Sequence, residues 1–428
     1  MTLIWFLIIG LFVLLATGIP VALAIGIPSL IYVIVDGSIP NFAAVQTMVG
    51  GANTYPLLAI PFFIFAGNLM NISGVTTRIF DFSNKLVGHI KGGLGHVNVI
   101  ASVIFAGMSG AAIADAGGLG TIEITAMRQA GYDDKVTIGI TAASSTIGPI
   151  IPPSMVAVIY AVIASASVGR LFAAGIIPGL LMGGSLMLLI YLMAGRYTMP
   201  LSPKASFKEI LHSSKDAFFA LLTPGIILGG IFFGIFTPTE AAAIASLYAI
   251  ILGAFIYREM SWRAFYNAVK DSMSTTVQVM FIVVSATLFA WILAREQVPQ
   301  AVASFILSKT QNYYLILFAI NLILLIVGMF METVASINIL VPVFIPLMQQ
   351  LGIDPVHFGV MMILNLMIGI LTPPFGTVLF VLSSVAKVSV EEVAKDTMIF
   401  ILPLLAVLAL IVLFPQLTLF LPNLIFGQ

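Results

Sequence analysis

The sequence predicts an all-α polytopic membrane protein with two inverted-topology repeats, each containing a re-entrant hairpin and a broken helix. Three observations predict this fold class: the apolar composition, the distribution of Lys and Arg, and a weak internal repeat. Of the 428 residues, 60% are apolar and 8% are charged, whereas soluble domains carry roughly 25% charged residues. The mean hydropathy is +1.15. The lipid bilayer is therefore the expected surroundings, and a soluble enzyme is excluded.

Charge and motif content exclude further classes. The 17 basic and 17 acidic residues give a formal net charge of zero, so no net field attracts nucleic acid. The absence of cysteine excludes disulfides, thiolate metal sites and cysteine nucleophiles. The Gly-rich segments follow no predicted strand, and Gly107-Met-Ser-Gly110 lacks the last glycine of a nucleophile elbow. The sequence indicates neither an enzyme nor a bound cofactor.

Ten apolar stretches are predicted to cross the membrane, where a spanning helix takes about 20 residues. They are 3–17, 20–35, 56–74, 137–163, 171–195, 217–236, 238–256, 275–294, 357–382 and 398–421. The first lacks a basic leader and is expected to be a retained span. Two further blocks, 92–130 and 312–350, are too long for one span and break near their middles. An arm of ~15 residues reaches only ~22 Å, short of the ~30 Å hydrocarbon core, so both blocks are predicted to be re-entrant hairpins.

The basic residues predict the orientation. With the N-terminus outside, 14 of the 17 Lys and Arg residues fall on inner segments, and only Arg170, Arg295 and Lys309 do not. Such a bias is typical of cytoplasmic loops. It is lost if either hairpin crosses fully, because everything after that hairpin then inverts. The polar linker 196–216 is expected on the inner face, and the N-terminus on the periplasmic face.

A gapless shift of 221 residues aligns several elements of the two halves. The matched segments are Gly131–Asp133 with Gly352–Asp354, Ile147-Gly148 with Ile368-Gly369, and Pro152-Pro153 with Pro373-Pro374. The alternative is the general similarity of apolar segments. Each half has five predicted crossings, and an odd number requires the second half to be inverted. Inverted repeats are typical of transporters, whose sites lie where broken helices of the two halves meet.

The repeat divides the chain at residue 205. The first half, 1–205, contains scaffold helices 1–74, a surface helix 75–91, the hairpin 92–130, the broken span 137–163 and the span 171–195. The second half, 206–428, contains the linker, scaffold 217–294, a surface helix 297–311, the hairpin 312–350, the broken span 357–382 and the span 398–421.

Four irregular segments are predicted to lie within the membrane: Ser109–Asp115, Gly328–Thr333, Ser144–Ser154 and Asn365–Gly376. Proline frees backbone carbonyls, which in lipid need protein, water or an ion as partner. Carbonyl and hydroxyl oxygens suit sodium, and half-helix N-termini suit a carboxylate. The alternative is a set of proline kinks satisfied by neighbouring helices. The predicted sodium ligands are Ser109, Ser145 and Gly148 in the first half, and Gly328, Thr333, Gly369 and Thr372 in the second.

Buried ionisable residues are functional candidates in a membrane protein. Asp115 and Glu332 occupy the hairpin tips and are predicted to bind substrate with Ser109 and Ser154. Arg295 either binds the substrate anion or anchors the end of a span. Glu123 and Arg128 are interpreted as structural, and Glu240 as the helix cap after Thr237-Pro-Thr239.

The proline breaks Gly148–Ser154 and Gly369–Gly376, the tip Ser109–Asp115 and the paired hairpins resemble the large membrane subunit of tripartite ATP-independent periplasmic (TRAP) transporters over the whole chain. The resemblance is strongest to members that carry sialic acid. At fold level the chain is also similar to elevator-type sodium/dicarboxylate symporters. The family's first tip is often richer in serine, and here Ala111 and Ala112 take positions that could have supplied hydroxyls, which leaves more of the coordination to the backbone.

The resemblance implies an elevator-type transporter with a fixed scaffold and a mobile domain that holds both hairpins and both broken spans. It implies sodium-coupled uptake of an organic acid, of the sialic acid or C4-dicarboxylate class, across the bacterial inner membrane. It also implies a small four-span membrane partner and a periplasmic substrate-binding protein. The alternatives are a stand-alone sodium/dicarboxylate symporter, an ion channel, and an intramembrane protease, for which Asp115 lacks a second aspartate.

Overall fold

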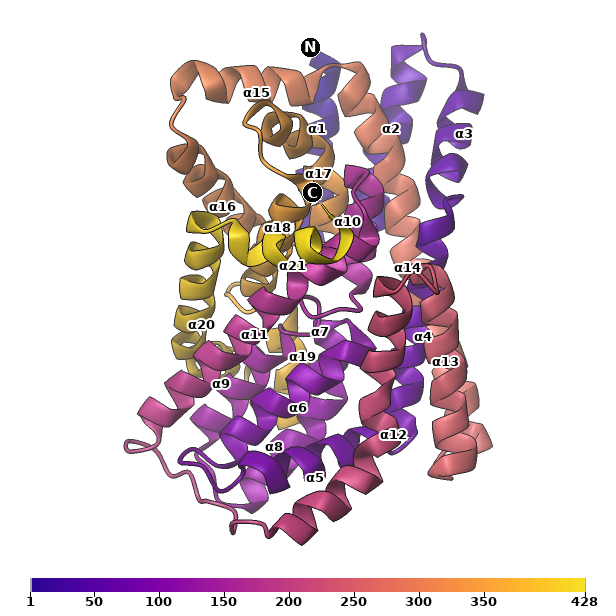
Figure 1. Cartoon of the computed structure of the whole chain (residues 1–428). Coiled ribbons are helices and arrows are strands. Elements are labelled where there is room, and N and C mark those ends of the chain that lie inside the picture. The colour runs from indigo at the N-terminus through magenta and orange to yellow at the C-terminus, as the bar shows by residue number, and fades with distance from the viewer. Residues whose placement is uncertain (1, 428) are drawn as a thin grey trace.

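The computed structural model describes residues 2–427, and this part of the chain is helical without strands (Figure 1). The helices of the first half are α1 (Thr2–Ala16), α2 (Val21–Asp36), α3 (Asn41–Ala52), the 3₁₀ helix η1 (Tyr55–Leu58), α4 (Ala59–Ile72), α5 (Val75–Val87), α6 (Leu94–Ser109), α7 (Ala112–Gly117), α8 (Leu119–Gln129), α9 (Asp134–Ser145), α10 (Met155–Ala164) and α11 (Val168–Met193).

The second half continues in the same way. Its helices are α12 (Phe207–Phe232), α13 (Pro238–Ile251), the π-helical turn η2 (Leu252–Ile256), α14 (Trp262–Arg295), α15 (Val298–Lys309), α16 (Tyr313–Phe330), α17 (Thr333–Gln350), α18 (Pro355–Gly369), α19 (Thr377–Ala386), α20 (Val390–Leu413) and α21 (Gln416–Phe426). Eight helices of the described chain are long and apolar enough to cross a membrane.

Large apolar side chains cover much of the outer surface. Phe233 is 83% exposed, Leu192 66% and Leu402 63%. Soluble proteins rarely expose contiguous apolar surface on this scale, and a bilayer buries it. The chain is therefore a multi-pass membrane protein.

Helix ends follow local sequence signals. Thr237 and Glu240 form a reciprocal capping box at the start of α13, as Ser206 and Glu209 do for α12. Each box satisfies backbone N–H groups that the first helical turn leaves free. The predicted capping role of Glu240 is confirmed.

Several predicted boundaries were wrong. The linker 196–216 is shorter because α12 begins at Phe207 after the Ser206 cap. The span 275–294 is the end of a 34-residue helix, α14, whose polar first turns a hydropathy criterion does not detect. Residues 36–55, which lie between the predicted spans 20–35 and 56–74, include α3 and the first residue of η1.

The last predicted span, 398–421, is two helices. α20 begins earlier, at Val390, behind its Ser389 cap and ends at Leu413. Pro415 lacks a backbone N–H and disfavours helix at the residue before it, so α21 starts anew and packs on α11.

Two groups of packed helices stand side by side (Figure 1). In one, α4 packs against α13 and α14, and α14 packs against α2 and α3. In the other, α9 and α11 pack against α20, and α16 packs against α18. The short helices α15 and α5 lie at opposite ends of the molecule in this view.

Candidate functional site

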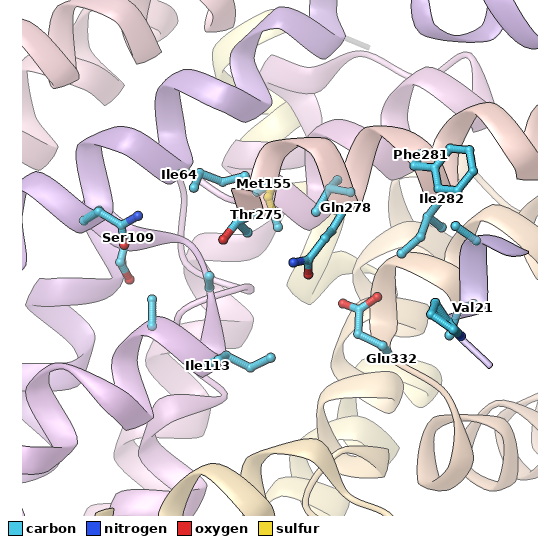
Figure 2. Close-up of a pocket in the computed structure, with 17 residues that line it drawn as sticks. Val21, Ile64, Ser109, Ile113, Met155, Thr275, Gln278, Phe281, Ile282 and Glu332 are labelled. Carbon is cyan, nitrogen blue, oxygen red and sulfur yellow. The ribbon is translucent and has the colours of Figure 1, made fainter. Parts of the chain in front are cut away.

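The two predicted hairpin tips face one cavity of about 720 Å³ between the two groups of helices. Ser109, Ala111, Ile113 and Ala114 line it from the first hairpin, and Glu332 lines it from the second. Figure 2 shows Ser109 and Ile113 on one side of the cavity, Glu332 on the other, and Thr275 and Gln278 of α14 between them. Ligand pockets typically enclose ~300–1,000 Å³, so this volume suits a small organic molecule.

The first tip is a tight turn between α6 and α7. Gly110 has a left-handed φ of +61°, and a Cβ there would overlap the carbonyl oxygen of Pro153, so only glycine fits without strain. Ser109 is 4% exposed and its hydroxyl has no hydrogen-bond partner among the described residues. An unpartnered buried hydroxyl is costly, and Ser109 is therefore a candidate ligand for an ion or substrate.

The first break separates α9 from α10 and is buried from Thr146 to Ser154. It lies against the first tip, since a Cβ on Gly148 would be 3.6 Å from the backbone nitrogen of Ala111. The Ser145 hydroxyl donates to the carbonyl of Ala142 at 2.8 Å. The Ser154 hydroxyl donates to Pro149 and accepts from the Ala157 N–H, so that it caps α10. The structure thus brings Gly148 to the tip that follows Ser109.

The second tip and the second break also meet. A Cβ on Gly369 would lie 2.6 Å from Cα of Gly328, so the backbones touch. Thr333 is buried at the first position of α17, and the Thr372 hydroxyl donates to Ile368 at 2.8 Å. Of the four predicted ligands here, Gly328 and Gly369 are in direct contact.

Glu332 is the N-cap of α17. One carboxylate oxygen, Oε2, accepts hydrogen bonds from the backbone N–H groups of Val334 and Ala335, at 2.9 and 3.2 Å. This arrangement stabilises the negative charge at the positive end of the helix. The other oxygen remains available to the cavity.

Three predicted substrate ligands do not line the cavity: Ser154, whose hydroxyl caps α10, Asp115 and Arg295. Asp115 is 1% exposed, on α7 below the tip, and is absent from the cavity wall. Arg295 ends α14, where it donates to Ser38 at 2.7 Å and lies 3.7 Å from Asp36. This placement favours the anchor alternative for Arg295. No Lys or Arg lines the cavity within the described chain.

Three polar residues of the cavity wall were not predicted from the sequence: Asn68 on α4, and Thr275 and Gln278 on α14. The Asn68 amide donates to Ser272 of α14 at 2.8 Å, which joins helices 204 residues apart. Polar residues three positions apart in an apolar helix lie on one face. Thr275 and Gln278 have this spacing, so the sequence contained a signal for them.

Comparison with known proteins places the fold among membrane transporters. The YdaH transporter of Alcanivorax borkumensis has a similar crystal structure, with a TM-score of 0.61, 15% identity, and 86% of each chain covered. This likeness concerns the fold alone.

Sequence comparison identifies the family. The model of the "Tripartite ATP-independent periplasmic transporter, DctM component" matches residues 8–417. The sialic acid TRAP transporter large permease protein SiaM of Vibrio cholerae is 49% identical over 98% of both chains. The sialic acid permease SiaT of Haemophilus influenzae is 44% identical, over 99% of this chain and 68% of its own. The C4-dicarboxylate permease DctM of Pseudomonas aeruginosa is 42% identical over 86% of both.

The chain belongs to the DctM family and is a large permease of the TRAP transporters. The predicted resemblance is confirmed. The protein is thus a transporter component, and its relatives are permeases rather than enzymes.

Proposed function

We propose that this permease performs sodium-coupled uptake of an organic acid by an elevator mechanism, with sialic acid as the first substrate to test. The observation that carries the proposal is the cavity between the two hairpin tips, whose walls come from both groups of helices. In this proposal α4 and α14 belong to a fixed scaffold. The hairpins and broken helices form the body that moves with the substrate.

The matching helix order of the two halves supports an inverted repeat. Helix α9 begins at residue 134 and α18 at 355, α10 at 155 and α19 at 377, and α11 at 168 and α20 at 390. These offsets stay within one residue of the 221-residue shift. The opposite positions of α5 and α15 (Figure 1) are what inversion requires.

Two sodium ions are proposed, one at each tip. The first site combines Ser109, Ser145 and Gly148, and the second combines Gly328, Thr333, Gly369 and Thr372. The unpartnered Ser109 hydroxyl and the contact between Gly328 and Gly369 support them. Because the described cavity wall lacks Lys and Arg, sodium at the tips would offset the substrate carboxylate.

The substrate class is proposed from the cavity and the relatives together. Asn68, Ser109, Thr275 and Gln278 offer hydrogen bonds to hydroxyl or amide groups, beside apolar Ile64 and Ile282. This mixed wall suits a polyhydroxylated acid. The two relatives named for sialic acid, at 49% and 44% identity, are more similar to this chain than the Pseudomonas aeruginosa relative named for C4-dicarboxylates, at 42%.

The partners are proposed to be a small four-span membrane subunit and a periplasmic substrate-binding protein. The permease is proposed to lie in the inner membrane, with its N-terminus on the periplasmic side. The family match supports the two partners, whereas the basic residues on the proposed inner segments and the apolar outer surface support the orientation and the membrane location. Without native cysteine, single cysteines can test the orientation. Cysteine at Ser38 or Asp354 should react with an impermeant maleimide in intact cells, and cysteine at Ser206 should not.

Uptake into proteoliposomes tests the function. The permease, its small subunit and the binding protein are supplied with radiolabelled sialic acid or succinate, with and without an inward sodium gradient. Saturable, sodium-dependent uptake of sialic acid supports the proposal. Uptake that is independent of the binding protein favours a stand-alone symporter, and non-saturating flux favours a channel.

A further inference from the structure

A second polar site lies inside the first hairpin, away from the cavity. It contains two buried carboxylates, Asp115 on α7 and Glu123 on α8, each 1% exposed. The two carboxylates lie close enough to influence each other electrostatically, and none of the ion pairs of the described chain joins either of them to a Lys, Arg or His. Two like charges in an apolar interior are strongly destabilising unless a positive charge joins them.

The surroundings of these carboxylates are organised by α6 and α9. The Asn98 amide donates to Glu123 Oε2 and to the Thr141 hydroxyl, both at 2.8 Å. The Ser144 hydroxyl donates to the Asn98 carbonyl oxygen at 2.7 Å. This network fixes Glu123 through one oxygen and leaves the other free.

Four oxygen atoms at this site have no hydrogen-bond partner among the described residues. They are both carboxylate oxygens of Asp115, Oε1 of Glu123 and the hydroxyl of Ser102. Ser102 is 1% exposed and its side chain lies beside Asp115. A proton bound to one of these oxygens satisfies that atom and can be donated in a hydrogen bond to one neighbouring oxygen. A metal ion, in contrast, binds several hard oxygen ligands at once.

We propose that Asp115, Glu123 and Ser102 bind a sodium ion inside the first hairpin, in addition to the two ions proposed at the tips. Ser102 lies seven residues before Ser109, about 10 Å along α6, so the site is distinct from the first tip. The repeat does not generate it, because the positions 221 residues after Asp115 and Glu123 hold Ser336 and Phe344. The ion would hold α7 and α8 against α6.

The proposal rests on sodium coupling, and ²²Na⁺ binding to the purified permease complex separates the two ideas. We expect Asp115→Asn and Glu123→Gln to bind one sodium ion fewer per chain than the wild-type protein. The matched control is Asp396→Asn on α20, a buried carboxyl outside this site, which should bind the wild-type number. Equal binding by all four proteins overturns the proposal and leaves sodium coupling intact.

Other outcomes are equally decisive. A wild-type protein that binds no sodium overturns both the coupling and this site. The variants could instead bind as many sodium ions as the wild-type protein and show a changed pH dependence of uptake. In that case the cluster binds a proton and not sodium, and the proposal is overturned. If the carboxyl variants do not reach the membrane, Ser102→Ala replaces them. At least a threefold weakening of one class of sodium sites supports the proposal, and an unchanged binding isotherm contradicts it.

Discussion

The two hairpin-and-break regions follow each other in the same order along the chain, but they differ in detail. The second arm of the first hairpin is divided into α7 and α8, whereas α17 is continuous, and the two breaks are buried to different degrees. The first break is buried along its whole length, from residue 146 to 154. The second break exposes Pro374 and Phe375, and the Phe375 ring meets Phe330 at 5.8 Å between centroids. Segments matched in sequence can therefore have different surroundings, because the helices that pack over a segment decide how deeply it is buried.

The polar contents of the two regions differ as well. In the first, Asn98 connects α6 with α8 and α9 through buried hydrogen bonds. In the second, Asn365 of α18 donates to the backbone carbonyl and the side-chain oxygen of Asn321 on α16, in a partly buried place. The first region is therefore held by a polar interior, and the second depends more on close backbone contact.

The largest expected effect comes from the glycines that permit the tip contacts. Gly110→Ala places a Cβ on a residue with a left-handed φ, which costs about 1–2 kcal/mol, and brings that Cβ against the carbonyl oxygen of Pro153. Gly369→Ala brings a Cβ against the backbone of Gly328. We expect both variants to lose uptake and to unfold at lower temperature in detergent. Gly184→Ala, on α11 with no atom near its added Cβ, is the control and should resemble wild type. Normal uptake by the tip variants would show that the contacts are not needed.

The next effect separates the two polar interiors. Asn98→Leu leaves Glu123 and Ser144 without their partner and should reduce the free energy of unfolding by roughly 2–4 kcal/mol, because it removes a hydrogen bond to a buried charged group and leaves that group unsatisfied. Asn365→Leu should cost about 1–3 kcal/mol, because it removes neutral hydrogen bonds. Thermal unfolding of the two purified variants measures the difference. Equal destabilisation would contradict the proposed contrast.

A smaller effect is expected at the scaffold wall of the cavity. Gln278→Leu removes one polar partner of the substrate, which costs about 1–1.5 kcal/mol and corresponds to roughly a tenfold rise in KM. Val277→Leu is the control, since Val277 is 67% exposed on the outer side of α14. An unchanged KM for Gln278→Leu would remove α14 from the substrate site.

The smallest effects concern the sodium hydroxyls. Ser145→Ala and Thr372→Val should each raise the sodium concentration for half-maximal uptake, by about threefold if the lost contact is worth roughly 0.6 kcal/mol. We expect the larger change for Ser145, because water reaches the enclosed first break less easily. Thr125→Val is the control, because its hydroxyl donates to the carbonyl of Thr121 on the exposed face of α8. A sodium dependence unaltered in both variants would leave coordination to the backbone.

Much of the local architecture followed from the sequence, and its errors have a common cause. Proline and glycine positions predicted where α9 and α18 end, because these residues act on their own backbone. Amphipathic turns such as the start of α14 were missed, because they combine polar and apolar faces and lower the mean hydropathy. The boundary between α20 and α21 was also missed, although Pro415 was a visible signal.

The sequence by itself determined that the chain is a membrane protein with helices interrupted at proline and glycine residues. Composition and backbone chemistry are local properties, and they are readable residue by residue. Only the tertiary structure decided which polar groups share a site. It put Gln278 into the cavity, Arg295 beside Ser38, and Asp115 near Glu123 below the tip. The physical reason is that these contacts join helices that lie far apart in the sequence, or depend on a kink such as the one at Gly118 between α7 and α8. The spacing of residues along the chain does not encode either of them.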